Sequence, residues 1–212
     1  IFLRPIASGM PLGFFSFGIG MLLLGSLSMG WIPPAESQQV GLIIASFVFP
    51  LELIATVFAF LARDTMGTTT IGLFTTSWLT FGLADLLAKP GSTSTALGIY
   101  LFGFAGAVFL LAMMAWLAKP YFTILLLLAS TRMILSGLYE VGLPHALYTI
   151  SGYFGFALTA FAFYGAVAFA LEDGRQQQVL PLFRRGAADE AFQGFDSQLE
   201  RLEAEAGIRQ QL

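Results

Sequence analysis

The sequence contains no cysteine and a single histidine, His145, among its 212 residues. The absence of cysteine excludes disulfides, thiolate metal sites and cysteine nucleophiles. One histidine without a second histidine or a cysteine nearby does not make a metal site of known spacing. We therefore expect no metal and no other cofactor.

Charge is also scarce in this chain. Charged residues make up 11% of it and hydrophobic residues 57%, whereas an ordinary soluble domain has about 25% charged residues. A water-soluble globule of this length would have too few charges to cover its surface. The net charge of -3 speaks against nucleic acid as a partner, because proteins that bind it carry basic patches.

Recognised catalytic patterns are missing as well. The sequence has no Gly-x-Ser-x-Gly elbow, no phosphate-binding loop and no His-Glu-x-x-His pair. These patterns supply the nucleophiles, phosphate sites and zinc sites of common enzyme classes. We therefore expect that the protein is not an enzyme.

Long apolar runs dominate what remains. Six of them are long enough to cross a hydrocarbon core of about 30 Å, which takes about 20 helical residues. Proline, glycine or charged residues separate the runs, and a membrane barrel is excluded because its strands would be short and alternating. The predicted fold is an all-α polytopic membrane protein with six transmembrane helices: Met10–Ile32, Gln39–Ala62, Met66–Ala88, Ala96–Ala118, Tyr121–Val141 and Ala146–Leu171.

Basic residues near the helix ends predict the orientation, because the cytoplasmic side of a membrane protein collects lysine and arginine. One side has Lys89 alone, and the other has Arg4, Arg63, Lys119, Arg175, Arg184 and Arg185. Both termini are therefore expected to be cytoplasmic. The protein is expected to be a multi-pass protein of the plasma membrane or, in a bacterium, the inner membrane.

Two domains are predicted from the charge distribution. Residues 1–171 hold five basic and five acidic residues and form the transmembrane domain, so the net charge of -3 falls on residues 172–212. In this tail Phe192, Phe195, Leu199 and Leu202 recur at helical spacing, which predicts a short amphipathic helix. We expect that helix to lie in the cytoplasm, on the inner face of the protein or on a neighbouring subunit.

Two charged residues, Glu52 and Arg132, lie deep inside the apolar runs. A charge at the centre of a membrane helix costs about 2.5–3.5 kcal/mol on insertion scales. Counted along the helices from Arg63 and Lys119, the two residues lie about 16 and about 20 Å from the same side. Three interpretations stay open: an ion pair that joins the second and fifth helices, a position that binds protons or anions beside a pore, or a contact with lipid or another subunit.

Hydroxyl side chains are concentrated between residues 65 and 78, and they include Thr70, Thr75 and Thr76. In a membrane helix such groups bond their own backbone, bond another helix or replace water around a solute. So many in one run favour a solute path, although structural bonding within the bundle explains them about equally well.

Three short segments carry a resemblance to a known family. They are Pro11-Leu12-Gly13-Phe14 in the first predicted helix, Thr65-Met66-Gly67 with Phe74 and Ser77-Trp78-Leu79 in the third, and Val179-Leu180-Pro181-Leu182 after the sixth. With six spans at matching spacing, about residues 8–185 resemble the acetate uptake transporter family, also called the GPR1/FUN34/YaaH or succinate-acetate permease family.

The resemblance implies a six-helix protomer that assembles as a homohexamer, with a narrow path through each protomer. The solutes of the family are acetate and related small monocarboxylates, in some members succinate, and the transport is channel-like or proton-coupled. The pore constriction of the family matches Phe17 and Phe74, with a third member at Ser130 or Thr131. The other positions expected along the substrate path are Pro11, Leu12, Gly13, Thr70, Thr75, Thr76 and Trp78.

Some positions depart from the family. Ser8-Gly9-Met10 replaces the Asn-Pro-Ala part of its signature, Glu52 stands where relatives carry glutamine, and Arg132 occupies an apolar position. Because both unusual charges arise where the family is neutral, the resemblance favours the ion pair between Glu52 and Arg132.

Carboxylate chemistry sets a further expectation. Acetate is almost entirely anionic at neutral pH, and moving an anion through an apolar ring costs desolvation energy. A constriction of Phe17 and Phe74 favours the neutral acid, or a briefly dehydrated anion supported by hydroxyls and Arg132, so flux should rise as the external pH falls. The alternatives are a passage for a small neutral solute such as urea, an amide or ammonia, and a membrane scaffold or sensor that acts through the tail.

Overall fold

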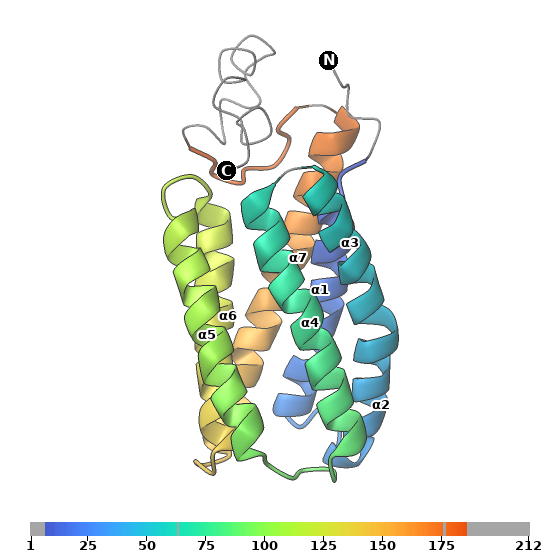
Figure 1. Cartoon of the computed structure of the whole chain (residues 1–212), viewed down its shortest axis with the longest axis vertical. Coiled ribbons are helices and arrows are strands. Elements are labelled where there is room, and N and C mark those ends of the chain that lie inside the picture. Colours follow the sequence, from blue (N-terminus) through green and yellow to red (C-terminus); the bar gives the residue numbers. More distant parts are fainter. Residues whose placement is uncertain (1–6, 63, 176, 186–212) are drawn as a thin grey trace, which may run out of the picture.

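The computed structural model describes residues 7–62, 64–175 and 177–185, and within these it contains helices and no strands. Six helical segments are long and apolar enough to cross a membrane, which confirms the predicted number of spans. Figure 1 shows them side by side as one bundle. The elements are α1 (Met10–Ser28), η1 (Pro34–Glu36), α2 (Ser37–Ile43), η2 (Ile44–Val48), α3 (Phe49–Leu61), α4 (Thr65–Leu87), α5 (Thr95–Ala115), α6 (Pro120–Glu140) and α7 (Ala146–Arg175).

Local sequence explains where several helices begin. The Asp64 side chain accepts a hydrogen bond of 3.0 Å from the backbone N–H of Gly67, which caps the start of α4. Ser94 does the same for α5 with the N–H of Leu97, at 3.3 Å. Such side chains satisfy backbone donors that have no partner inside the helix. The first span ends at Ser28, four residues earlier than predicted, since Gly30 has a positive φ of 73° that a helix does not allow.

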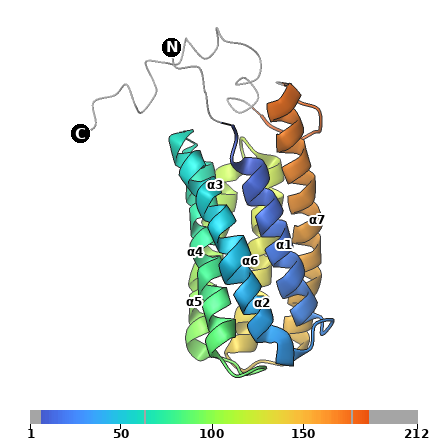
Figure 2. The same cartoon turned by 90° about the vertical axis from the view of Figure 1, so that its right-hand side faces the viewer.

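The second span, Pro34–Leu61, is irregular in its middle. Its residues Ile44–Val48 form the π-helical turn η2, directly before α3 with Pro50 in its first turn. Proline has no backbone N–H and crowds the carbonyl four residues earlier, so the chain widens locally to accommodate it. Figure 2 shows α2 and α3 following one another along the bundle. Glu52 lies two residues after Pro50, so this irregular turn sets the direction of its side chain.

Glycines allow the helices to approach one another closely. A Cβ atom added to Gly41 of α2 would lie 2.6 Å from the carbonyl oxygen of Gly82 in α4. A Cβ on Gly155 of α7 would lie 3.0 Å from the Cα atom of Gly25 in α1. Small residues of this kind let membrane helices pack backbone against backbone.

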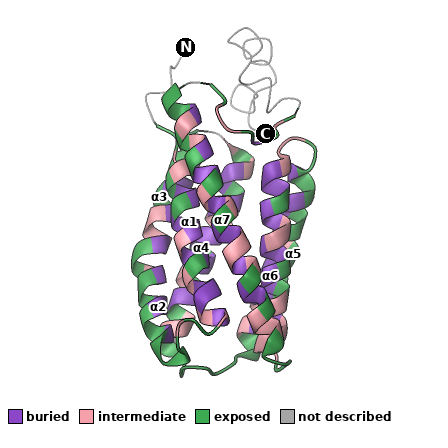
Figure 3. Ribbon diagram, turned by 180° about the vertical axis from the view of Figure 1, so that it is seen from behind, coloured by how far each residue is buried: buried purple, intermediate pink, exposed green. Residues whose placement is uncertain are grey.

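Apolar side chains also cover the outside of the bundle. On α3 alone, Leu53, Ile54, Val57, Phe58 and Phe60 are exposed. Figure 3 shows exposed residues along the outer faces of the helices and buried residues between them. This distribution is typical of a bundle that faces lipid or other subunits rather than water.

The start of α1 and the end of α7 lie at the same end of the bundle, as the prediction of termini on one side requires (Figures 1 and 2). The α5–α6 connection lies there too, and Lys119 in it forms an ion pair of 3.3 Å with Asp64. The α4–α5 connection with Lys89 lies at the opposite end (Figure 1).

The predicted boundary between the two domains falls inside α7, which continues to Arg175. Beyond it, residues 180–185 pack on the same end of the bundle. Arg184 forms two hydrogen bonds of 2.6 Å with the Glu172 carboxylate, and the backbone N–H of Arg185 donates to Ala118. The beginning of the predicted tail therefore belongs to the bundle. The predicted amphipathic helix, which starts near Phe192, lies outside the described residues.

Candidate functional site

The two aromatic residues expected to form a constriction lie against one another inside the bundle. Phe17 of α1 and Phe74 of α4 are buried, and their rings meet edge to face with centroids 5.1 Å apart. Phe74 also meets Phe104 of α5 edge to face at 5.3 Å. Aromatic pairs prefer this geometry because the positive ring edge faces the negative ring surface. The rings join α1, α4 and α5 across the centre of the bundle.

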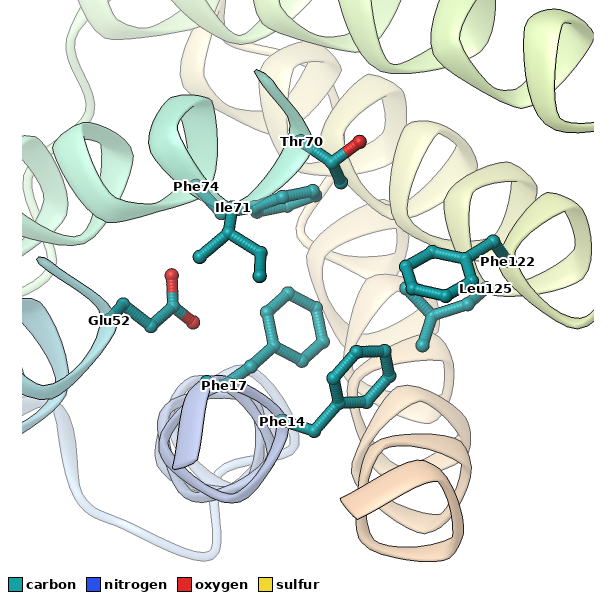
Figure 4. Close-up of a pocket in the computed structure, with 9 residues that line it drawn as sticks. Phe14, Phe17, Glu52, Thr70, Ile71, Phe74, Phe122 and Leu125 are labelled. Atoms are coloured by element: carbon teal, nitrogen blue, oxygen red, sulfur yellow. The ribbon is translucent and has the colours of Figure 1, made fainter. Parts of the chain in front are cut away.

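A small cavity of about 30 Å³ lies beside these rings. This volume holds about two water molecules, since one water needs about 10–15 Å³ by the same measure. Figure 4 shows side chains from α1, α3, α4 and α6 around it. The lining residues are Gly13, Phe14, Phe17, Glu52, Thr70, Ile71, Phe74, Phe122 and Leu125.

Glycines on α1 fix the positions of the side chains around this cavity. A Cβ on Gly13 would lie 3.2 Å from the Cβ of Ala55, so glycine brings α1 close to α3. A Cβ on Gly20 would lie 2.7 Å from the indole ring of Trp78, which therefore lies over bare backbone. Trp78 in turn contacts the Phe17 ring edge to face at 5.7 Å. The indole therefore packs against Phe17, but Trp78 is not itself among the lining residues.

Glu52 is the one residue with an ionisable side chain among those that line the cavity. Its side chain is 1% exposed, and neither carboxylate oxygen has a hydrogen-bond partner among the described residues. Its carboxyl group interacts with the Trp78 indole, but at a range beyond a hydrogen bond. The buried Thr70 hydroxyl, also in the lining, has no partner within the described part of the chain either. An apolar cavity thus contains two polar groups that are free to bond a solute.

The ion pair predicted between Glu52 and Arg132 is not formed, and this expectation is corrected. Arg132 is buried, but its side chain lies against α7, where a Cβ on Gly155 would be 3.2 Å from Nε. Arg132 interacts electrostatically with Tyr148 of α7. The physical reason is the helix order: α6 packs against α5 and α7, whereas α3 packs against α4 and α1. Similar depth in the membrane did not bring the two side chains to the same place.

The fifth predicted span, which is α6, was expected to contribute Ser130 or Thr131 to the constriction, but other residues of α6 line the cavity. The Ser130 hydroxyl donates to the Ala105 carbonyl at 2.9 Å and so ties α6 to α5. Thr131 is exposed and donates to the Leu127 carbonyl of its own helix at 2.9 Å. The α6 residues that line the cavity are Phe122 and Leu125, which the sequence analysis missed.

The predicted path hydroxyls divide into three environments. Thr70 faces the cavity, as described above. Thr75 is buried and bonded, because its hydroxyl contacts the Ile71 carbonyl at 2.8 Å and the Thr56 hydroxyl at 2.9 Å. Thr76 is exposed and donates to the Leu73 carbonyl at 3.1 Å. Of these three threonines, only Thr70 is among the residues that line the cavity.

The motif at the start of α1 contributes one lining residue. Pro11 lies half-buried in the first helical turn, and Leu12 is 36% exposed on the outer face. Gly13 lines the cavity. Over the described residues, no group of three or more histidine, aspartate and glutamate side chains is arranged to hold a metal ion.

Comparison with known proteins agrees with this architecture. The structure is similar to a solved structure of the bacterial acetate channel SatP, with a TM-score of 0.74 at 18% sequence identity, covering 84% of this chain and 99% of that one. No curated protein sequence matches the chain significantly. The sequence profile of the GPR1/FUN34/yaaH family matches residues 2–183. The predicted resemblance is therefore confirmed, the relatives are channel and transport proteins rather than enzymes, and the chain belongs to the GPR1/FUN34/yaaH family.

Proposed function

We propose that this protein conducts acetate and related small monocarboxylates, with succinate at the upper limit of size, across a membrane. The solute passes through the cavity beside Phe17 and Phe74. The cavity itself is the observation that carries the proposal, because it lies at the centre of a membrane bundle and combines an apolar wall with two unpartnered polar groups. The family match and the similarity to a bacterial acetate channel support the choice of solute.

The size of the cavity implies that side chains move during transport. Acetate has four heavy atoms, and a volume for about two waters is too small for it. Phe17 and Phe74 meet through ring edges, and such contacts contribute only about 0.5–1.5 kcal/mol beyond the buried area. Rotation of either ring opens the cavity at low cost. The two rings therefore act as a constriction that yields to a small solute and obstructs a large one.

The test is uptake of labelled acetate into vesicles that contain the purified protein. Phe17→Ala and Phe74→Ala remove the constriction, so we expect faster uptake and entry of longer monocarboxylates that the original protein excludes. Phe15→Ala is the matched control, since Phe15 lies on the same helix and is 40% exposed on its outer face. Unchanged rate and selectivity in both cavity variants would contradict the proposed path.

A small neutral solute such as urea is the second candidate, and the predominantly apolar lining favours it. Neutral solutes lose less hydration energy than anions when they enter an apolar site. Uptake of labelled urea by the same vesicles distinguishes the two functions. Rapid urea uptake without acetate uptake would replace the acetate proposal by this one.

Assembly and location complete the proposal. We place the protein as a homohexamer in the plasma membrane, or in a bacterium in the inner membrane, with the Lys119 end of the bundle in the cytoplasm. The exposed apolar side chains of α3 support burial in lipid or between subunits, and the predicted distribution of basic residues supports the orientation. The mass of the solubilised complex tests the number of subunits.

A further inference from the structure

We propose that Glu52 contacts the carboxyl group of the solute inside the cavity and restricts passage to the neutral acid, excluding the carboxylate anion. This inference rests on the proposed function and specifies its substrate form. Figure 4 shows the Glu52 carboxyl group directed toward the space bordered by Phe17, Ile71 and Phe74. The residue therefore faces the solute rather than another helix.

The surroundings of Glu52 lack a compensating charge. It lies on α3, which packs against α1, α4 and η2. Neither α1 nor η2 contains a charged or titratable residue, and α4 contains only Asp85, two residues before the helix ends. No cation on a helix that contacts α3 therefore compensates the Glu52 carboxyl group, and the polar groups of α4 beside it are neutral: the Thr70 hydroxyl and the Trp78 indole.

The fourth helix around the cavity, α6, does not supply a positive charge either. Its titratable residues are Tyr121, Arg132, Tyr139 and Glu140. The Tyr121 hydroxyl donates to the Phe161 carbonyl, and Arg132 lies against α7. Tyr139 and Glu140 occupy the last turn of the helix. A carboxylate that entered the cavity would therefore meet no cation among the lining residues.

This arrangement discriminates between the two forms of a carboxylic acid. The anion would leave water without meeting a counterion in the cavity, which opposes its entry, and an ionised Glu52 would repel it as well. The neutral acid carries an O–H donor that a Glu52 oxygen accepts. Neither Glu52 oxygen has a hydrogen-bond partner among the described residues, so the neutral acid bonds the carboxyl group without displacing an existing hydrogen bond.

Glutamine at this position would remove the discrimination. Its amide has nearly the shape of a carboxyl group, but it adds two N–H donors and has no negative form. A carboxylate anion would then find donors instead of repelling oxygens. Glu52→Gln is expected to admit the anion, which moves charge across the membrane, in addition to the neutral acid, which does not.

The experiment measures acetate uptake by vesicles from about pH 6 to about pH 8, with and without an imposed membrane potential of about 100 mV. Uptake by protein-free vesicles is subtracted, because neutral acetic acid also crosses lipid unaided. For the unmodified protein we expect the uptake rate to fall about tenfold for each unit rise in pH, because the fraction of neutral acid falls by the same factor. We expect this rate to be independent of the membrane potential. For Glu52→Gln we expect a fall of less than about threefold per pH unit and acceleration by an inside-positive potential.

A control variant and a second cavity variant complete the design. Glu36→Gln makes the same chemical change at an exposed position in η1, and it should behave as the unmodified protein. Thr70→Val removes the other unpartnered polar group of the lining without breaking a hydrogen bond between described residues, and it should lower uptake of the neutral acid several-fold. It also keeps the contact testable if Glu52→Gln does not fold.

The outcomes separate this inference from the proposed function. Acetate uptake that the potential drives in the unmodified protein would show that the anion passes, which overturns the inference and leaves the function intact. An identical pH profile and electroneutral uptake in Glu52→Gln would show that Glu52 does not contact the solute. Uptake no faster than in protein-free vesicles at any pH would instead contradict the proposed function.

Discussion

Glu52 and Arg132 are both buried charged residues in the middle of apolar helices, yet their surroundings differ. Glu52 lines a cavity and has no hydrogen-bond partner within the described chain, while Arg132 lies against the backbone of α7 beside Gly155 and interacts with Tyr148. The first environment has room for a solute, and the second is closely packed on the side of α7. The role of a buried charged residue therefore cannot be inferred from its depth in the membrane. It depends on the side chains around the residue and on whether a cavity lies beside it.

The largest expected effect concerns the packed region around Arg132. Replacing Gly155 by leucine places a side chain where a Cβ alone would lie 3.0 Å from the Gly25 backbone and 3.2 Å from Arg132 Nε. Overpacking of this kind costs about 1–3 kcal/mol, so we expect Gly155→Leu to lower the midpoint of thermal unfolding in detergent. Gly103→Leu is the control, since nothing lies within 4 Å of a Cβ on Gly103. Equal stability of both variants would mean that α1 and α7 are not closely packed.

A smaller effect is expected from removing the Arg132 charge itself. A buried charge without an ion-pair partner carries a desolvation cost, so its replacement by an apolar side chain of similar volume removes that cost. We expect Arg132→Met to retain or gain thermal stability and to leave acetate uptake within about twofold, with the same pH profile. This is the opposite of the change expected for Glu52→Gln. If uptake were lost while the protein stayed folded, Arg132 would be a contact of the solute, and the two charges would not differ as described.

Much of this fold could be predicted from the sequence because membrane-spanning helices are recognised by the length and apolar composition of their sequence. The six apolar runs correspond to the six spans. The irregular turn η2 was missed, although Pro50 inside an apolar run is its signal. Helix ends were accurate to a few residues where a proline or a positive φ stops the helix, as at Gly30.

The candidate site was harder to predict, since it depends on which helices are neighbours. Phe17 and Phe74 were identified through the family resemblance, and the structure brings them together. The pairing of Glu52 with Arg132 was wrong because residue counting gives depth but not the direction around the bundle axis. Phe122 and Leu125 were missed for the same reason, since a nearly uniform apolar helix gives no sign of which face points inward.

The central claim is that the solute passes through the cavity bordered by Phe17, Glu52 and Thr70. The absence of native cysteine allows a direct test, in which Thr70→Cys and Thr76→Cys each provide a single thiol on the same helix. Thr70 faces the cavity and Thr76 is exposed on the outer face. We predict that a small thiol reagent blocks acetate uptake by Thr70→Cys, that acetate slows this block, and that Thr76→Cys stays active. Block of Thr76→Cys with Thr70→Cys unaffected would contradict the claim and place the path elsewhere.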